Sequence, residues 1–542
     1  MSGPGGTEDL APGTLEAWEL HLGREVDAGS LRAELAEGTL PRAFHRVAGR
    51  VADEVALTID GETVTHGELD RRAARLGGWL EERGVGSGRR VVLCGNNSVE
   101  FLVAYLGILR AGAVVVPAGA GLTEYELRHF VEDSGASCAL AEGDALGRLR
   151  DIANAGGGLE RLVALRGAGE EEIATLEQAI SEGEPLEPGG GSGDDGAMLA
   201  YTSGTTGEPK GTPLTHGNLL ASLRGAMWAW RWTEEDVLVH ALPFSHQHGL
   251  SGAQITLLSG ARAVVHSSFD PELFCSTVES EKATVIFAVP AIYEKLAGWD
   301  GIGEKDLSSL RLAASGSAAL SPELAQKVSS VLGQKVLERY GSTETGLSVS
   351  NPYEGERQFG SVGFPLPGTE LLVVDGENNP LPPGEAGEIL LRGPQVFAGY
   401  WERPEATEES FYPGGWFRTG DVGRVDPEDG RLAITGRLKE LIITGGMNVY
   451  PREVEFALES HAAVDGAAVV GVPSERWGEE VVAFVVSGQD RPVETGELEA
   501  HAREQLSSYK VPKRFFEVEE FPRNEMGKVL QDELIELAQE EN

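Results

Sequence analysis

The chain has 542 residues, which is too long for one compact core, so we expect two or more domains. Its 45 basic and 86 acidic residues give a formal net charge of -41, which repels polyanions and argues against nucleic acid as a partner. The three cysteines are widely spaced and indicate neither a zinc site nor a disulfide framework. The first residues lack the basic and then apolar pattern of a signal peptide, so the sequence predicts a cytoplasmic protein.

Strand and helix patterns alternate from the first hundred residues onward. Arg90–Cys94 is an apolar strand, residues 96–98 can cap the next helix, and residues 114–116 form a second buried strand. The apolar run 101–117 is interrupted by Arg110 and Gly112, so we expect a buried helix followed by a strand and no membrane span. This pattern predicts a βαβ unit.

A loop rich in hydroxyl groups and glycines follows at residues 201–211, which read Tyr-Thr-Ser-Gly-Thr-Thr-Gly-Glu-Pro-Lys-Gly. Glycines bring bare N–H groups close to an anion, while hydroxyls and Lys210 add donors, so the composition suits a phosphate. The spacing is not that of a Walker P-loop, because Pro209 precedes the lysine and Gly211 follows it. Thr215 can cap a helix that runs to about Ala229, whose N-terminus favours an oxyanion. The alternative from composition alone is a plain linker.

Further α/β elements occupy the rest of the chain. Residues 263–266, 271–282 and 284–289 predict a second βαβ unit, and the turn, apolar strand and double glycine at 436–446 predict a domain junction. Beyond the junction, strands at 464–472 and 481–486 and a helix at 496–506 form a module large enough to fold as a domain. We therefore expect a leader at 1–40, in which a short amphipathic helix is possible, a large domain at 41–437 and a small domain at 438–542.

Five motifs occur in one order along the chain. They are the loop at 201–211, Tyr340-Gly341-Ser342-Thr343-Glu344, Trp416-Phe417-Arg418-Thr419-Gly420-Asp421, Gly436-Arg437-Leu438-Lys439, and Pro522-Arg523-Asn524-Glu525-Met526-Gly527-Lys528. In this order they resemble the adenylate-forming superfamily, and from about residue 41 to its end the chain resembles an acyl-CoA synthetase. The resemblance implies an α/β fold with a large N-terminal domain of stacked sheets and a small, mobile α+β C-terminal domain.

The resemblance also implies the chemistry and the partners. A carboxylic acid attacks the α-phosphorus of ATP to give an acyl-adenylate, and the thiol of coenzyme A then displaces AMP, with Mg²⁺ as the metal. Both steps develop negative charge, which calls for pre-placed cations and hydrogen-bond donors. The expected partners are thus a small-molecule acid, ATP and coenzyme A, and the expected assembly is a monomer or a homodimer.

Site residues are carried over from the family by motif. Nucleotide binding falls to Thr202, Ser203, Gly204, Thr205, Thr206, Gly207, Lys210, Ser317, Tyr340, Gly341, Thr343, Asp421 and Arg437. The catalytic set is Lys528, Thr343, Glu344 and Lys210, with Glu344 as the Mg²⁺ ligand because Mg²⁺ prefers carboxylate and phosphate oxygens. Lys439 holds the family's hinge position, and Gly445 and Gly446 line the tunnel for coenzyme A.

The acyl pocket is assigned to His246, Gly316, Ser342 and Arg357, whereas His248 is interpreted as a structural histidine. The stretch 350–363 resembles malonyl-CoA synthetases, in which an arginine before a Gly-x-Val-Gly turn pairs with the distal carboxylate. Arg357 holds that place, and a guanidinium can grip a carboxylate through two hydrogen bonds. The alternative interpretation is a surface arginine among Glu354 and Glu356. Malonate or a related small diacid is the leading substrate.

Departures from that pattern keep other substrates open. Ser342 stands where malonyl-CoA synthetases commonly carry Met, and Ser245 and Gln247 alter the histidine segment, so a medium-chain or long-chain fatty acid or an aryl acid remains an alternative. A second alternative is a stand-alone adenylation enzyme that loads a carrier protein, although no convincing aspartate to grip an amine follows the segment 236–250. A noncatalytic nucleotide-binding protein would be expected to have lost Lys210, Glu344 or Lys528, and all three are present.

Overall fold

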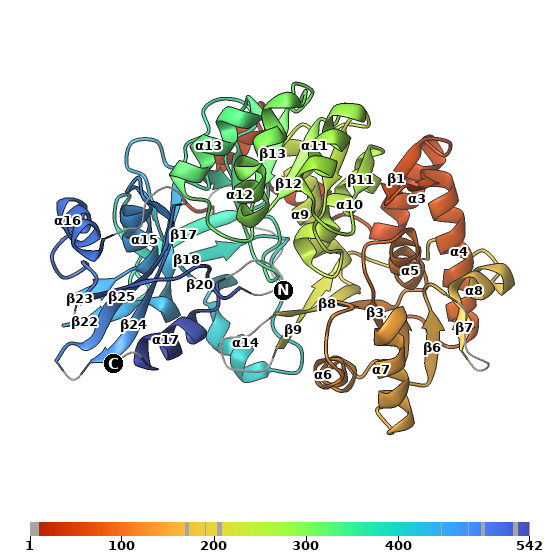
Figure 1. Ribbon diagram of the computed structural model, residues 1–542. Coiled ribbons are helices and arrows are strands. Elements are labelled where there is room, and N and C mark those ends of the chain that lie inside the picture. The colour runs from red at the N-terminus through yellow and green to blue at the C-terminus, as the bar shows by residue number, and fades with distance from the viewer. Residues whose placement is uncertain are drawn as a thin grey trace.

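The computed structural model describes residues 10–167, 173–189, 191–202, 209–445, 447–474, 476–488, 494–523 and 529–540. Four sheets organise this part of the chain (Figure 1), and helices cover the two largest. The predicted α/β fold, with a large N-terminal part and a small C-terminal domain, is confirmed. No helix among the described residues combines the length and the apolar character that a bilayer crossing requires.

The nine-stranded sheet forms the centre of the molecule. Its strand order is β16 (Phe364–Pro365), β15 (Val349–Ser350), β14 (Leu337–Tyr340), β13 (Leu312–Ser315), β12 (Val285–Ala288), β10 (Val237–His240), β11 (Arg262–Val265), β1 (Val55–Ile59) and β2 (Glu62–Thr65). The six strands from β14 to β1 run parallel, and their near-continuous apolar sequences are typical of strands buried on both faces. The helices that accompany this sheet are α3 (Leu40–Arg50), α9 (His216–Ala229), α10 (Gln247–Ser259), α11 (Pro271–Ser280), α12 (Pro290–Gly298) and α13 (Pro322–Leu332).

The seven-stranded sheet contains the first predicted βαβ unit. Its order is β7 (Ala174–Thr175), β6 (Arg161–Ala164), β5 (Cys138–Ala141), β3 (Arg90–Cys94), β4 (Val114–Ala118), β8 (Gly196–Thr202) and β9 (Lys210–Thr215). Its helices are α4 (His66–Glu82), α5 (Val99–Arg110), α6 (Glu124–Ser134), α7 (Gly143–Asn154) and α8 (Leu176–Glu182). Ser98 caps α5 by accepting a hydrogen bond from Phe101 N at 3.1 Å. The predicted strand, cap, buried helix and strand are therefore confirmed.

The second predicted βαβ unit is also present, with one difference in its pairing. The structure places a strand at β11, a helix at α11 and a strand at β12, in chain order. However, β11 and β12 are not neighbours, because β10 lies between them and pairs in parallel with both. Chain order alone does not reveal which earlier strand enters such a gap.

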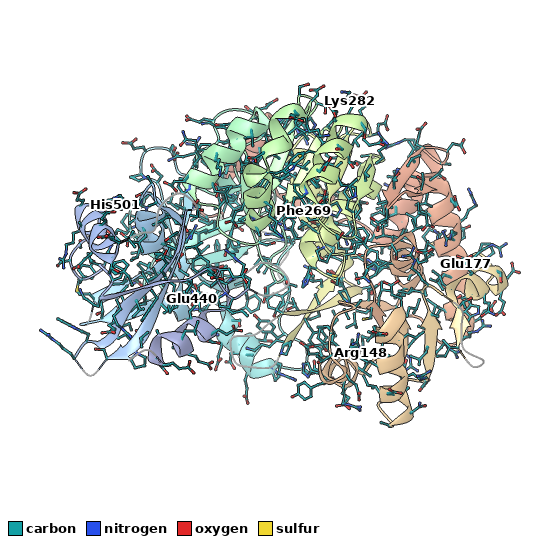
Figure 2. All side chains as sticks on the ribbon, viewed as in Figure 1. Arg148, Glu177, Phe269, Lys282, Glu440 and His501 are labelled. Carbon is teal, nitrogen blue, oxygen red and sulfur yellow. The ribbon has the colours of Figure 1, made fainter. Side chains whose placement is uncertain are left out.

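Two smaller sheets complete the fold. The third has β17 (Glu370–Val374), β18 (Ala386–Arg392), β20 (Trp416–Val425), β19 (Phe411–Tyr412) and β21 (Leu432–Arg437), with helix α14 (Pro404–Ser410). The C-terminal sheet has β23 (Met447–Val449), β22 (Ile442–Thr444), β25 (Gly478–Ser487), β24 (Val464–Ser474) and β26 (Arg514–Glu517), with α15 (Pro451–Glu459), α16 (Thr495–Gln505) and α17 (Gln531–Glu540). Figure 2 labels residues in three parts of the molecule. Arg148 and Glu177 lie on helices of the seven-stranded sheet, and Phe269 and Lys282 flank α11 in the chain. Glu440 and His501 lie in the C-terminal segment.

The N-terminal segment contains two helices, α1 (Thr14–Leu22) and α2 (Ala28–Ala36), where the sequence left one short helix open. The buried Trp18 donates its indole N–H to the carbonyl of Thr369 at 2.8 Å. Arg32 pairs with the buried Glu370, and Arg224 on α9 donates to carbonyls at the end of α2. The segment thus joins α9 to the third sheet.

Candidate active site

Polar side chains gather where the parallel strands of the nine-stranded sheet end. His240, Ser315 and Tyr340 are the last residues of β10, β13 and β14. The carboxyl ends of parallel strands share one edge of a sheet, and in open α/β sheets ligands bind outside that edge. This edge is the candidate active site.

The predicted phosphate loop connects β8 to β9. Thr202 and Lys210 face each other across this antiparallel pair, so the loop's two ends are held together. Ser203, Gly204, Thr205, Thr206 and Gly207 lie outside the described residues. After β9 the predicted cap of α9 is present, because Thr215 and Asn218 form a reciprocal capping box.

Glu344 and Lys210 meet at one tyrosine. The hydroxyl of Tyr400 donates to Glu344 Oε1 at 3.1 Å, and Lys210 Nζ lies 5.2 Å from the centre of the same ring. Ser342 N donates to Thr345 Oγ1 at 3.0 Å, which fixes the turn that carries Thr343. The turn also requires glycine at 341, because a Cβ there would lie 1.8 Å from the carbonyl oxygen of Gly346.

Tyr340, Asp421 and Arg437 form a connected group, as expected for a nucleoside site. The hydroxyl of Tyr340 donates to Asp421 Oδ2 at 2.6 Å, and Arg437 Nε lies 2.9 Å from Asp421 Oδ1. Burial and the neighbouring carboxylate raise the pKa of Tyr340 well above its ordinary value, and Asp421 raises the pKa of Arg437. The structure thus brings these three residues together from β14, β20 and β21.

A buried arginine beside the predicted acyl wall was missed by the sequence reasoning. Arg339 on β14 is 8 % exposed, and its Nη2 has no hydrogen-bond partner among the described residues. A Cβ at position 316 would lie 2.4 Å from its Nε, so only glycine leaves room for the guanidinium. A signal was present in the sequence, because Glu338 and Arg339 place two charges in a short buried strand.

Two histidines extend this polar group. His248 Nδ1 lies 2.9 Å from the hydroxyl of Ser317, whose φ of 71° is unusual for a residue other than glycine. Within the described ranges, His248 Nε2, His240 Nε2 and Ser315 Oγ are buried without a hydrogen-bond partner. Burial lowers the pKa of His248 well below its ordinary value, with Arg339 and His240 adding to the effect, and burial lowers that of His240 to about 3. Arg339 therefore carries the charge of this group.

The structure gives Arg357 other partners than the predicted carboxylate. Its guanidinium donates to the carbonyls of Lys335, Tyr353 and Pro352 at 2.6, 3.2 and 3.4 Å. Arg357 is also buried, so the alternative of a surface arginine does not hold either. These contacts clamp the loop after β15, and we replace Arg357 by Arg339 as the candidate for the acyl pocket.

The remaining predicted residues lie in three places. His246 is the N-cap residue of α10 and is half-buried. Lys439 lies in the short helix η3 (Leu438–Glu440) between β21 and β22, and Gly445 adopts a φ of 57° and donates its N–H to the carbonyl of Trp477 at 2.7 Å. Gly446 and Lys528 lie outside the described residues.

The sequence and the fold were compared with those of known proteins. The model of the AMP-binding enzyme family matches residues 44–401, and that of the AMP-binding enzyme C-terminal domain matches residues 453–528. The chain belongs to the AMP-binding enzyme family. It is an adenylate-forming enzyme, an AMP-forming acyl-CoA synthetase that uses ATP and coenzyme A.

Relatives within the AMP-binding enzyme family differ in their acids. A feruloyl-CoA synthase of Amycolatopsis sp is 38% identical over 88% of this chain and 94% of its own. A mitochondrial malonate–CoA ligase of Mus musculus is 37% identical over 82% of this chain and 81% of its own. The crystal structure of ATP-bound MatB from Rhodopseudomonas palustris superposes with a TM-score of 0.85 at 35% identity, covering 93% of this chain and 99% of that one.

Proposed function

We propose that this enzyme joins malonate, or a related small dicarboxylate, to coenzyme A. The observation that carries the proposal is the buried guanidinium of Arg339, which lies against Gly316 in the predicted acyl wall and lacks a partner at Nη2 among the described residues. A buried charge is strongly unfavourable unless it is paired. A substrate with a second carboxylate supplies that pair.

The other acids considered would fit this group less well. The hydrocarbon tail of a fatty acid would keep water away from Arg339 without pairing it, which leaves the charge buried and uncompensated. An aryl acid with a phenolic hydroxyl could accept a hydrogen bond from Arg339 or His248, and one relative is named a feruloyl-CoA synthase. The relative named a malonate–CoA ligase supports the diacid.

In the proposed reaction, one oxygen of the substrate carboxylate attacks the α-phosphorus of ATP. An O–P bond forms, the bond to pyrophosphate breaks, and an acyl-adenylate results. The sulfur of coenzyme A then attacks the acyl carbon, and AMP leaves. Thr202, Lys210 and the loop between them would hold the terminal phosphates, while Tyr340, Asp421 and Arg437 would hold the nucleoside. Lys528 would bridge the carboxylate and the α-phosphate.

Mg²⁺ fits the carboxylate at Glu344. The side chain is half-buried, Tyr400 donates to its Oε1, and no residue in the described part of the chain donates to its Oε2. Mg²⁺ is commonly held by one or two carboxylates together with substrate phosphates, so a single protein carboxylate suffices. When bound, the metal would neutralise charge on the phosphate oxygens.

The proposal is tested with a panel of acids. AMP formation is measured with ATP and malonate, methylmalonate, octanoate, benzoate or ferulate, each with coenzyme A, with a carrier protein, or with neither. We expect the highest kcat/KM with a dicarboxylate and a strict need for coenzyme A. Preference for octanoate, benzoate or ferulate would overturn the diacid assignment, and turnover only with a carrier protein would overturn the acceptor.

A second test separates the two half-reactions. Lys528→Ala should lower acyl-adenylate formation by about 1,000-fold, since a single donor to developing charge contributes on that order. It should spare thioester formation from supplied acyl-adenylate, because the α-phosphate bond has then already formed. Equal loss of both half-reactions would contradict the role. The division near residue 438, the movement at Lys439, the cytoplasmic location and the monomeric or homodimeric state stay predictions.

A further inference from the structure

We propose that Tyr400 is a positioning residue for the adenylation half-reaction, which holds Glu344 and Lys210 in place for magnesium and pyrophosphate. Its hydroxyl donates to Glu344 Oε1 at 3.1 Å, and Lys210 Nζ lies over its ring at 5.2 Å from the centre. One side chain thus contacts the carboxylate and the ammonium group assigned to the phosphate end of ATP. The inference rests on that proposed assignment.

Packing and a main-chain hydrogen bond hold Tyr400 in position. Phe397 packs against its ring edge to face with the ring centres 5.0 Å apart, and Phe397 itself is 2 % exposed. The main-chain N–H of Tyr400 donates to Thr407 Oγ1 at 2.9 Å. Gly399 permits this approach, because a Cβ there would lie 2.3 Å from Thr407 Cγ2. The ring is therefore held against a packed wall.

The same segment contacts both elements that it positions. Phe397 N donates to the carbonyl of Glu344 at 2.9 Å, and Trp401 N donates to the carbonyl of Gly211 at 2.8 Å. The main chain on either side of Tyr400 is thus bonded to the turn that carries Glu344 and to the strand that begins at Lys210. The tyrosine and its two partners form one unit built from three distant parts of the sequence.

This arrangement has a chemical consequence. An ammonium group and a carboxylate that meet without a ligand tend to pair with each other. The ring of Tyr400 has the cation on its face, where the π electrons attract it, and the anion at its hydroxyl. Tyr400 therefore keeps the two charges in separate places, so that Lys210 remains available to phosphate and Glu344 to the metal.

The proposal predicts a graded effect of two substitutions. Tyr400→Phe keeps the ring and removes the hydroxyl, so the Mg²⁺ concentration for half-maximal adenylation should rise about tenfold, the order expected for one hydrogen bond to a charged group. Tyr400→Leu also removes the ring face and should slow adenylation about tenfold further. Thioester formation from supplied acyl-adenylate should stay within twofold of the wild-type rate in both, because pyrophosphate has already left.

A matched control is Tyr412→Phe, which removes the hydroxyl of a half-buried tyrosine on β19, a strand that contains neither Glu344 nor Lys210. It should leave the Mg²⁺ dependence unchanged. A wild-type Mg²⁺ dependence in Tyr400→Phe would overturn the proposal, as would an equal slowing of both half-reactions, which indicates a general structural role. Calorimetric titration of each variant with Mg·ATP alone needs no acid, so it tests Tyr400 even if the substrate assignment fails.

Discussion

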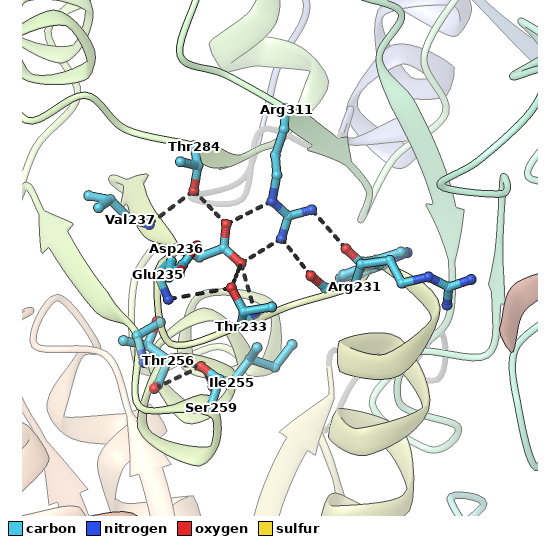
Figure 3. A network of polar contacts seen from close by, with 12 residues as sticks. Arg231, Thr233, Glu235, Asp236, Val237, Ile255, Thr256, Ser259, Thr284 and Arg311 are labelled. Carbon is cyan, nitrogen blue, oxygen red and sulfur yellow. Dashed lines mark hydrogen bonds and ion pairs between the residues drawn. The ribbon is translucent and has the colours of Figure 1, made fainter. Parts of the chain in front are cut away.

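Two arginines on neighbouring strands of the nine-stranded sheet, near opposite strand ends, differ in whether their charge is paired. Arg311, just before β13, donates from Nε and Nη2 to the two oxygens of Asp236 at 2.7 and 2.6 Å, and to two main-chain carbonyls near the end of α9 (Figure 3). Arg339 lies near the carboxyl end of the neighbouring strand β14, and its Nη2 has no partner in the described part of the chain. We call the Arg311–Asp236 group the closed network, because its charges are paired. The network at Arg339 is open, because its Nη2 has no partner among the described residues.

The pKa values follow the same contrast. Burial alone would lower the pKa of Arg311, but its pairing with Asp236 raises it. Burial lowers the pKa of Arg339 to about 10, so the group stays charged at neutral pH. The pairing of Arg311 with Asp236 stabilises the fold. The Nη2 of Arg339 has no partner among the described residues, and in our proposal it binds the ligand. Four predictions follow from this difference.

The largest effect is expected at the closed network. Arg311→Met leaves Asp236 buried with its charge uncompensated, which should lower the free energy of unfolding by about 3 kcal/mol. At a temperature where the variant is folded, KM for the acid should change less than twofold. Thermal or urea unfolding and steady-state kinetics measure the two quantities, and a stable variant with impaired acid binding would reverse the contrast.

Arg339→Met should show the opposite pattern. Removing the proposed partner of the distal carboxylate should lower kcat/KM for malonate by about 100-fold, the order for loss of one member of a buried charge pair. The free energy of unfolding should not fall, because an uncompensated buried charge is removed. Arg357→Met is the matched control, since its guanidinium is bonded to carbonyls, and its loss of stability should exceed its loss of acid specificity.

His248→Phe is expected to have a smaller effect on the acid. The ring fills a similar volume but loses Nε2, the buried atom without a partner in the described ranges. We expect KM for malonate to rise about tenfold and KM for ATP to stay unchanged. Kinetics with each substrate varied separately measure this, and an equal rise in both constants would place His248 among structural residues.

The smallest effect concerns Glu338, the residue before Arg339, whose side chain points to the other face of β14. Burial raises its pKa from 4.5 to about 8. The hydrogen bond from the N–H of Gly360 and the charge of Arg452 on α15 act in the opposite direction and lower the pKa by less. Between these values the folded state holds a proton that the unfolded state releases, so this group's contribution to stability falls as the pH rises. Glu338→Gln should therefore raise Tm, measured by thermal unfolding, at pH 8 and change it little at pH 4.5. An equal rise in Tm at both pH values would show that ionisation of Glu338 does not cause the effect.

Much of the framework could be predicted from local sequence. Apolar runs correctly predicted β3 and α5, and Ser98 and Thr215 cap the helices expected of them, because capping and burial depend on neighbouring residues. The Asp421 and Arg437 motifs meet as the family resemblance implies. The direction of a loop side chain is not local, and for that reason the sequence does not reveal that the guanidinium of Arg357 donates to three main-chain carbonyls.

What the sequence determined by itself was the family, the order of the strands and helices, and the residue types available for phosphate chemistry. Periodicity and short motifs carry this information because they act over a few neighbouring residues. Only the tertiary structure decided that β10 enters between β11 and β12, that Tyr400 joins Glu344 to Lys210, and that Arg339 lies buried against Gly316. Each depends on segments far apart in the chain, where packing and desolvation select the partners.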